Sequence, residues 1–143
     1  MSRTARLSLL LTASVLGAVG CSVPNLESPA CTESKSAIRE FYSIHFASEM
    51  TFSAEALKLR SRFLTPDFAA KLVSSKEGTD PFTTGTEDIP RAFRVGECRE
   101  ILPERTESNV LLFWRDDQRT EQRTIRVEAT DKNDTWLVNN ISR

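Results

Sequence analysis

Apolar residues recur at helical spacing in the first half of the chain. In segment 34–50 they stand at positions i, i+3, i+4, i+7 and i+8 (Ile38, Phe41, Tyr42, His45 and Phe46), which is typical of one face of a helix. Ser34 or Ser36 can cap the start of this helix. The pattern therefore predicts an amphipathic first helix with its aromatic side chains turned inward.

Two shorter helices are expected to follow. The second covers about 53–63, with Ser53 as its N-cap. The third begins at Thr65-Pro66-Asp67, because Thr is a good N-cap, Pro fits the first helical position and an acid suits the positive end of the helix dipole. It should end before Gly78.

The hydrophobic period changes from 3.6 to 2 after residue 90, which predicts strands at 93–102, 109–114, 124–129 and 136–141. Segment 109–114 is apolar on both faces, so it is expected in the centre of the sheet, whereas 124–129 alternates and should have one wet face. In the first strand, strict alternation would place Cys98 on the face opposite Phe93 and Val95.

Polar turns at 116–118 and 131–134 leave only short connections, so the sheet should be an antiparallel meander. Helices that precede strands in this way indicate an α+β domain with the N-terminal helices packed on one face of a curved sheet.

The first twenty residues are typical of an export signal. Arg3 and Arg6 precede an apolar run from 7 to 19 that is too short to span a bilayer comfortably. The run ends in Ala18-Val19-Gly20-Cys21, which resembles the lipobox of bacterial lipoproteins, where the Cys carries the lipid. An ordinary secretory signal cleaved near Gly20, with a Cys there by chance, is the alternative.

These features predict three parts: a lipoprotein signal peptide at 1–20, a lipidated Cys21 with a flexible tether at 21–31, and a single α+β domain at 32–143. We expect a palmitate-type membrane anchor in a bacterial envelope, with the domain facing the periplasm. Ser22 after the Cys looks like outer-membrane sorting in enteric-type bacteria.

Charge and cysteine content limit the possible partners. Without residues 1–20 the chain has 17 Lys and Arg against 20 Asp and Glu, a formal charge of −3, and no basic stripe, so nucleic-acid binding is not expected. If Cys21 carries lipid, Cys31 and Cys98 remain, and in an oxidising compartment they should form a disulfide. Two separate thiols, with Cys98 buried in a strand, are the alternative.

The order of several short motifs resembles that of a known family. The motifs are Phe41-Tyr42, then 63–68 (FLTPDF), then Asp80-Pro81-Phe82, and a last strand at 135–141 (TWLVNNI). They resemble the lipoproteins grouped as domain of unknown function 3828, a family similar to the nuclear transport factor 2-like (cystatin-like) fold. The resemblance implies a cone of helices against a curved sheet, and it places Asp80, Phe82 and Asp88 in the family's acid–aromatic pattern. Segment 83–87 departs from the commoner form.

His45 is the single histidine. On its helix it shares a face with Tyr42, and it could meet Glu49 one turn later. One interpretation is a general acid or base inside a cavity. The other is a buried imidazole with a structural hydrogen bond, which we favour because no second histidine or reactive Cys joins it. A single His also argues against zinc, so we expect no metal and no cofactor.

The acidic loop 79–90 (TDPFTTGTEDIP) allows two interpretations. Asp80 or Asp88 could serve as a cavity base, or the three acids could bind calcium, although they lack the spacing of an EF-hand loop. Alternatively the loop is a structural joint, with Asp80 and Asp88 capping turns and Phe82 filling the gap between helices and sheet. We favour the joint.

Charged side chains alternate in sign around 115–128, which is typical of a solvated hairpin and could also form the docking edge for a protein. Trp114 and Trp136 are expected in the core. The leading functional prediction is a non-enzymatic envelope lipoprotein that binds a small apolar ligand or a protein partner. The alternatives are an isomerase- or dehydratase-like enzyme with Tyr42, His45 and an acid in its cavity, and a periplasmic immunity or inhibitor protein.

Overall fold

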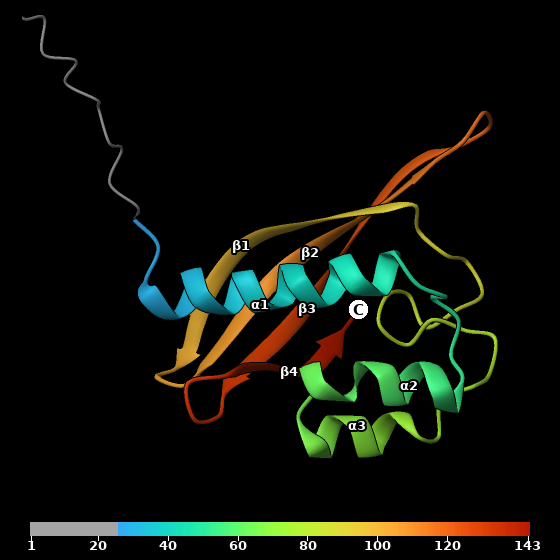
Figure 1. Ribbon diagram of the computed structural model, residues 1–143. Coiled ribbons are helices and arrows are strands. Elements are labelled where there is room, and N and C mark those ends of the chain that lie inside the picture. Colours follow the sequence, from blue (N-terminus) through green and yellow to red (C-terminus); the bar gives the residue numbers. More distant parts are fainter. Residues whose placement is uncertain (1–25) are drawn as a thin grey trace, which may run out of the picture.

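The computed structural model describes residues 26–143, and the predicted signal peptide and lipidated Cys21 lie outside the described residues. Three α-helices precede a sheet of four strands, so the chain has the predicted α+β order (Figure 1). Within residues 26–143, no helix has both the length and the apolar character needed to cross a membrane.

Helix α1 (Pro29–Phe46) begins earlier than the sequence predicts. Ser28 is its N-cap and accepts a hydrogen bond from the Cys31 amide at 3.2 Å, and Pro29 occupies the first turn. The expected capping by Ser34 or Ser36 is therefore wrong, and the helix also includes three residues that we assigned to the tether. Its buried face is the predicted one, with Ile38, Phe41, Tyr42 and His45 turned inward.

The next helices match their predicted caps. Helix α2 (Ala54–Arg60) begins after Ser53, whose hydroxyl accepts from the Ala56 amide, and a 3-10 turn η1 (Ser61–Phe63) follows. Helix α3 (Pro66–Leu72) begins after Thr65, whose hydroxyl accepts from the Phe68 amide. The two helices lie beside one another and below α1 in Figure 1.

The sheet is an antiparallel meander in the order β1-β2-β3-β4, as predicted. Its strands are β1 (Ala92–Leu102), β2 (Arg105–Arg115), β3 (Thr120–Asp131) and β4 (Trp136–Ser142). The central strands extend several residues beyond their apolar segments, because β2 and β3 pair without interruption from Arg105↔Thr130 to Arg115↔Thr120. On β2 every second side chain from Thr106 to Trp114 is buried.

A bulge in β1 corrects the predicted facing of Cys98. The register against β2 shifts between Val95 and Cys98, so one extra residue reverses the alternation beyond it. Cys98 therefore reaches the first turn of α1, where its sulfur and that of Cys31 have disulfide geometry, with Cα atoms 5.7 Å apart. The structure thus shows a disulfide-compatible pair where the sequence predicts one.

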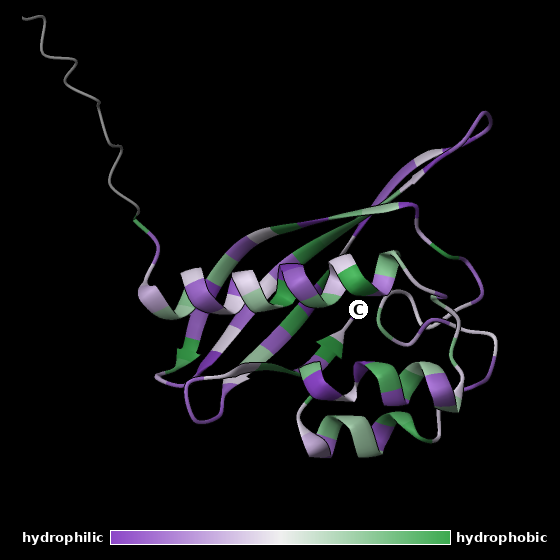
Figure 2. Ribbon diagram, in the orientation of Figure 1, coloured by the Kyte–Doolittle hydropathy of each residue, from purple (hydrophilic) through white to green (hydrophobic). Residues whose placement is uncertain are grey.

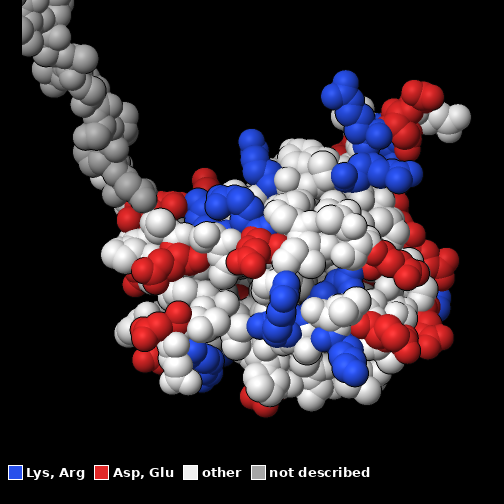
Figure 3. Space-filling model, in the orientation of Figure 1, with Lys and Arg blue, Asp and Glu red and all other residues white. Residues whose placement is uncertain are grey.

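Helices cover one face of the sheet, and the core lies between the two layers (Figures 1 and 2). The buried cluster combines α1 with alternate residues of the central strands, among them Ile38, Phe41, Val110, Leu112 and Val127. Trp114 is 4 % exposed and belongs to this cluster, whereas Trp136 is half-buried at its edge. Lys and Arg side chains are interspersed with Asp and Glu over the visible surface (Figure 3).

Candidate functional site

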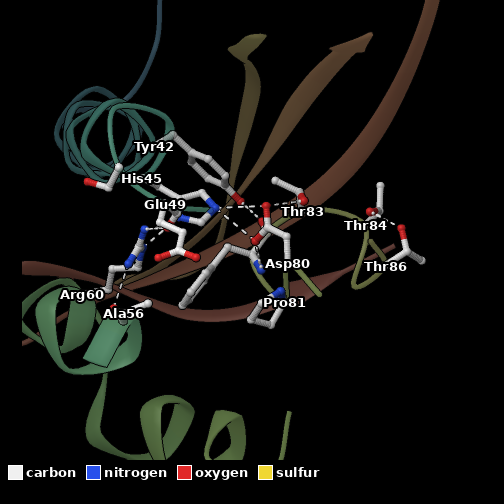
Figure 4. A network of polar contacts seen from close by, with 12 residues as sticks. Tyr42, His45, Glu49, Ala56, Arg60, Asp80, Pro81, Thr83, Thr84 and Thr86 are labelled. Atoms are coloured by element: carbon white, nitrogen blue, oxygen red, sulfur yellow. Dashed lines mark hydrogen bonds and ion pairs between the residues drawn. The ribbon is translucent and has the colours of Figure 1, made fainter. Parts of the chain in front are cut away.

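The structure brings together a histidine and an acid that are distant in sequence. His45 projects from α1 towards Asp80 of the acidic loop, and its Nε2 lies 3.0 Å from both carboxylate oxygens (Figure 4). Both side chains are fully buried. Of the predicted cavity residues, Tyr42, His45, Asp80 and Phe82 therefore do form one cluster.

Arg60 is the third member of this cluster, and sequence reasoning missed it. Its Nε donates to His45 Nδ1 at 2.8 Å, while its terminal nitrogens donate to the backbone carbonyls of Ala56 at 2.8 Å and Glu49 at 2.5 Å. The available signal was its position three residues after Leu57, which puts a cation on the apolar face of α2. Arg60 is only 3 % exposed.

These contacts fix the state of the imidazole. An arginine can only donate, so Nδ1 of His45 must accept, and the ring proton must then sit on Nε2, which donates to Asp80. The imidazole thus bridges a buried guanidinium and a buried carboxylate. Both of its nitrogen positions are occupied, so it cannot accept a substrate proton without first breaking its contact with Arg60.

Burial and the neighbouring charges also perturb the groups around the histidine. Burial lowers the pKa of Arg60, and the negative charge of Asp80 opposes this shift. Burial raises the pKa of Tyr42 well above its ordinary value, with a further contribution from Asp80. The Tyr42 hydroxyl therefore stays protonated and donates to the Phe82 carbonyl at 2.6 Å.

Asp80 also organises its own loop. Its carboxylate accepts hydrogen bonds from the Phe82 amide at 3.0 Å and the Thr83 hydroxyl at 2.6 Å, and its carbonyl accepts from the Gly85 amide at 2.8 Å. Arg143, next to β4, donates to two further carbonyls of this loop. The loop is thus held to α1 through His45, which also binds Arg60 of α2, and to the chain beyond β4 through Arg143.

Phe82 fills the space between the layers, as the joint interpretation predicts. It is 2 % exposed, and its ring centroid lies 5.2 Å from that of Phe41 and 5.1 Å from that of His45. Both aromatic pairs meet edge to face, a favourable geometry. The acidic loop is a packed joint around a buried polar cluster.

Two predicted contacts are wrong. Asp88 neither joins the cavity group nor serves as the expected turn cap; its carboxylate instead accepts two hydrogen bonds from Arg119 of the β2–β3 hairpin, at 3.1 and 2.9 Å. The hydrogen bond from Arg119 is the largest cause that lowers the pKa of Asp88. The side chain of Glu49 does not meet His45, because Arg60 occupies that position and binds the Glu49 carbonyl.

An open groove lies between α2 and α3, apart from the buried cluster. It has a volume of about 510 Å³. Its lining is mainly apolar and includes Phe52, Leu57, Ala69, Ala70 and Val73. Lys58 and Glu77 also line the groove and provide charge of both signs. Nothing in the sequence pattern distinguished these residues from ordinary core positions.

The described part of the chain contains no preformed metal-binding site. Within residues 26–143, no group of three or more His, Cys, Asp or Glu side chains is placed to hold a metal ion. Asp80 and Asp88, which could have shared a calcium ion, are held by different cationic or hydrogen-bonding partners.

Comparison with known proteins gives information on the fold but not on the function. No family model matches this chain, and no curated protein matches it. One solved structure, a protein of unknown function from Bacteroides thetaiotaomicron VPI-5482 determined at 2.10 Å resolution, is similar with a TM-score of 0.54 and 22 % sequence identity. The alignment covers 79 % of this chain and 91 % of that one. At this identity the similarity shows a shared fold alone.

Proposed function

We propose that this protein is a lipid-anchored envelope protein whose domain binds a small apolar ligand in the groove between α2 and α3. In this proposal residues 1–20 direct export, Cys21 carries the acyl chains, and the domain faces the periplasm. The disulfide-compatible pair Cys31 and Cys98 supports an oxidising compartment.

The binding role rests on one observation: the groove between α2 and α3 is open to solvent, whereas the polar cluster around His45 is fully buried. A volume of about 510 Å³ falls within the range of small-molecule sites, roughly 300–1,000 Å³. The apolar lining can exclude water from a ligand, and Lys58 and Glu77 can orient a polar end. The groove is therefore the open concave site on which we base the function.

The same contrast argues against the isomerase- or dehydratase-like alternative. His45 and Asp80 are fully buried, and their polar atoms are occupied by Arg60, by the loop backbone and by Thr83. A general base needs hydrogen-bond reach to a substrate proton. Here the cluster stabilises the junction of helices, loop and sheet.

We also infer that the domain belongs to the nuclear transport factor 2-like class of folds. A long first helix lies across an antiparallel meander with bulges in β1 and β4, and bulges increase the curvature of a sheet. The shared fold with an uncharacterised bacterial protein is compatible with this assignment.

A fluorescent apolar anion, 8-anilinonaphthalene-1-sulfonate, can test the groove without detergent in a Cys21→Ser variant. We expect saturable binding at one site, with loss of binding in Ala70→Trp, which fills the groove. The matched control is Ala47→Trp, because Ala47 is an exposed alanine at the C-cap of α1. Equal dye binding in both tryptophan variants would refute the groove as the site. Mass spectrometry of the unaltered protein tests acylation of Cys21 separately.

A further inference from the structure

One end of the sheet carries most of the exposed apolar side chains. Five large hydrophobic residues are exposed within residues 26–143, and three of them belong to this end: Leu26 at 95 %, Ile101 at 42 % and Leu102 at 56 %. Ile101 and Leu102 are the last residues of β1, before the two-residue turn to β2. The arrowhead of β1 is correspondingly green in Figure 2.

The chain enters the domain at the same end. The start of α1 and the β1–β2 turn lie together in Figure 1, and the Cys31–Cys98 pair joins them with Cα atoms 5.7 Å apart. Leu102 lies four residues beyond Cys98 along a strand, a distance of about 13 Å. The turn and the entry point of the chain are therefore held in a fixed relation.

The length of chain before α1 limits how far this end can move from an anchor. Only eight positions separate Cys21 from Pro29, the first residue of α1. Eight residues span at most about 28 Å when fully extended. A domain tethered this closely must keep the end that bears the tether towards the bilayer.

We propose that the β1–β2 turn contacts the bilayer that holds the acyl anchor, with Ile101 and Leu102 inserted at the headgroup boundary. This proposal rests on the lipid anchor proposed above. In this proposal the apolar turn contacts the membrane surface, and this contact fixes the orientation of the domain. Apolar side chains at such a boundary add to the attachment that acyl chains provide.

The charges near the turn indicate what kind of contact this is. Glu100 and Glu104 flank the apolar pair, and so do Arg99 and Arg105, so the turn has no net charge. Arg99 is also paired with Glu107 at 2.7 Å. The contact should therefore depend on apolar burial and not on anionic lipid.

The opposite end of the sheet has a different character. The β2–β3 connection at 116–119 consists of charged and polar residues and lies far from the start of α1 in Figure 1. Helices α2 and α3 are also displaced from the chain entry in this view. The proposed orientation consequently leaves the groove accessible from the periplasm.

Tryptophan quenching on vesicles tests the orientation with the full lipidated protein. Leu102→Trp places a reporter in the β1–β2 turn, and Gln118→Trp places a matched reporter in the exposed β2–β3 connection. The proteins are reconstituted into vesicles of phosphatidylcholine with brominated acyl chains, and emission is compared with unbrominated vesicles. The parent protein, with Trp114 and Trp136, provides the background. We expect loss of the added emission for Leu102→Trp only, and the same loss when anionic phosphatidylglycerol is included.

Equal quenching of the two reporters overturns the proposal. The proposal is also overturned if the protein self-associates through the turn and thereby shields the tryptophan at position 102 from the brominated lipid. Introducing Ile101→Glu beside the Leu102→Trp reporter provides a second check, because the charge should restore the emission. Mass spectrometry of the same samples identifies the source of a failure. If Cys21 is not acylated, the anchor and the orientation both fail; if it is acylated and Leu102→Trp is not quenched, only the orientation fails.

Discussion

Replacing Asp80 by Asn tests whether the buried cluster holds the domain together. The change keeps the shape of the side chain and removes its negative charge. The Asp80 carboxylate accepts hydrogen bonds from His45, from the Phe82 amide and from the Thr83 hydroxyl, all within 3.0 Å. An amide has one acceptor oxygen, and its NH₂ group would face one of these donors. At least one buried donor then loses its partner, and Arg60 loses its counter-charge.

The expected cost follows from the burial of the charges. Asp80 and His45 are fully buried and Arg60 is 3 % exposed, so solvent cannot replace the lost interactions. Removal of one partner of a buried charged pair typically costs about 3–5 kcal/mol. A net stability of about 5–15 kcal/mol is usual for a domain, so Asp80→Asn should remove a large share of it.

Urea unfolding at neutral pH, followed by tryptophan fluorescence, measures this loss. Asp117→Asn is the matched control, because Asp117 is exposed in the β2–β3 connection, and its effect should stay within about 0.5 kcal/mol. A loss below about 1 kcal/mol for Asp80→Asn would contradict the reasoning, since that is the value of a single ordinary hydrogen bond.

A double-mutant cycle with Arg60→Met then isolates the coupling across the imidazole. In the double variant neither a buried cation nor a buried anion is left uncompensated, so its loss should be smaller than the sum of the two single losses. Coupling between members of one network is usually about 0.5–3 kcal/mol. Strict additivity would show that the histidine does not link the two charges.

Three further predictions concern other contacts. Replacing both Cys31 and Cys98 by Ala should lower the free energy of unfolding by about 4 kcal/mol in the chain-entropy model for this loop, and adding a reductant should have no further effect on that variant. Gly85→Ala should cost more in urea unfolding than Gly78→Ala, although both glycines have positive φ. A Cβ at Gly85 would lie 2.7 Å from the guanidinium carbon of Arg143, so it would displace the guanidinium from the Pro81 and Thr83 carbonyls that it binds; equal costs would contradict this. The pKa of Asp88 is lowered from 3.8, so its ion pair stabilises the fold above pH 3.8 and this stabilisation is lost as the pH falls through the lowered pKa. The Tm difference between the parent protein and Asp88→Asn should therefore shrink below pH 3.8, and a constant difference would contradict this.

The local pattern determined most of the secondary structure. The inward face of α1 and the caps of α2 and α3 follow from interactions within a few residues of one another. The meander order follows from the short turns that join successive strands. The predictions were wrong where a second local interaction opposed the one on which the prediction was based. Ser28 with Pro29 made a better start for α1 than the predicted serines, and one extra residue in β1 reversed the facing of Cys98.

The candidate site depended on contacts that sequence spacing cannot specify. The sequence indicated Tyr42, His45, Asp80 and Phe82, but membership of a network depends on which side chains approach across 15 to 40 positions. Arg60 belongs to the network, whereas Asp88 pairs with Arg119 at the surface, because donors and acceptors pair with the partner that lies nearest once the layers close.

The α+β order, the predicted export and anchoring signal, and the residue types of the acidic joint can be read from the sequence alone. The packing of the layers was needed to show that His45 is held between Arg60 and Asp80, and that an open groove lies elsewhere, between α2 and α3. The physical reason is that hydrophobic period and capping act over one or two turns, whereas burial, charge pairing and cavity shape depend on how whole layers pack.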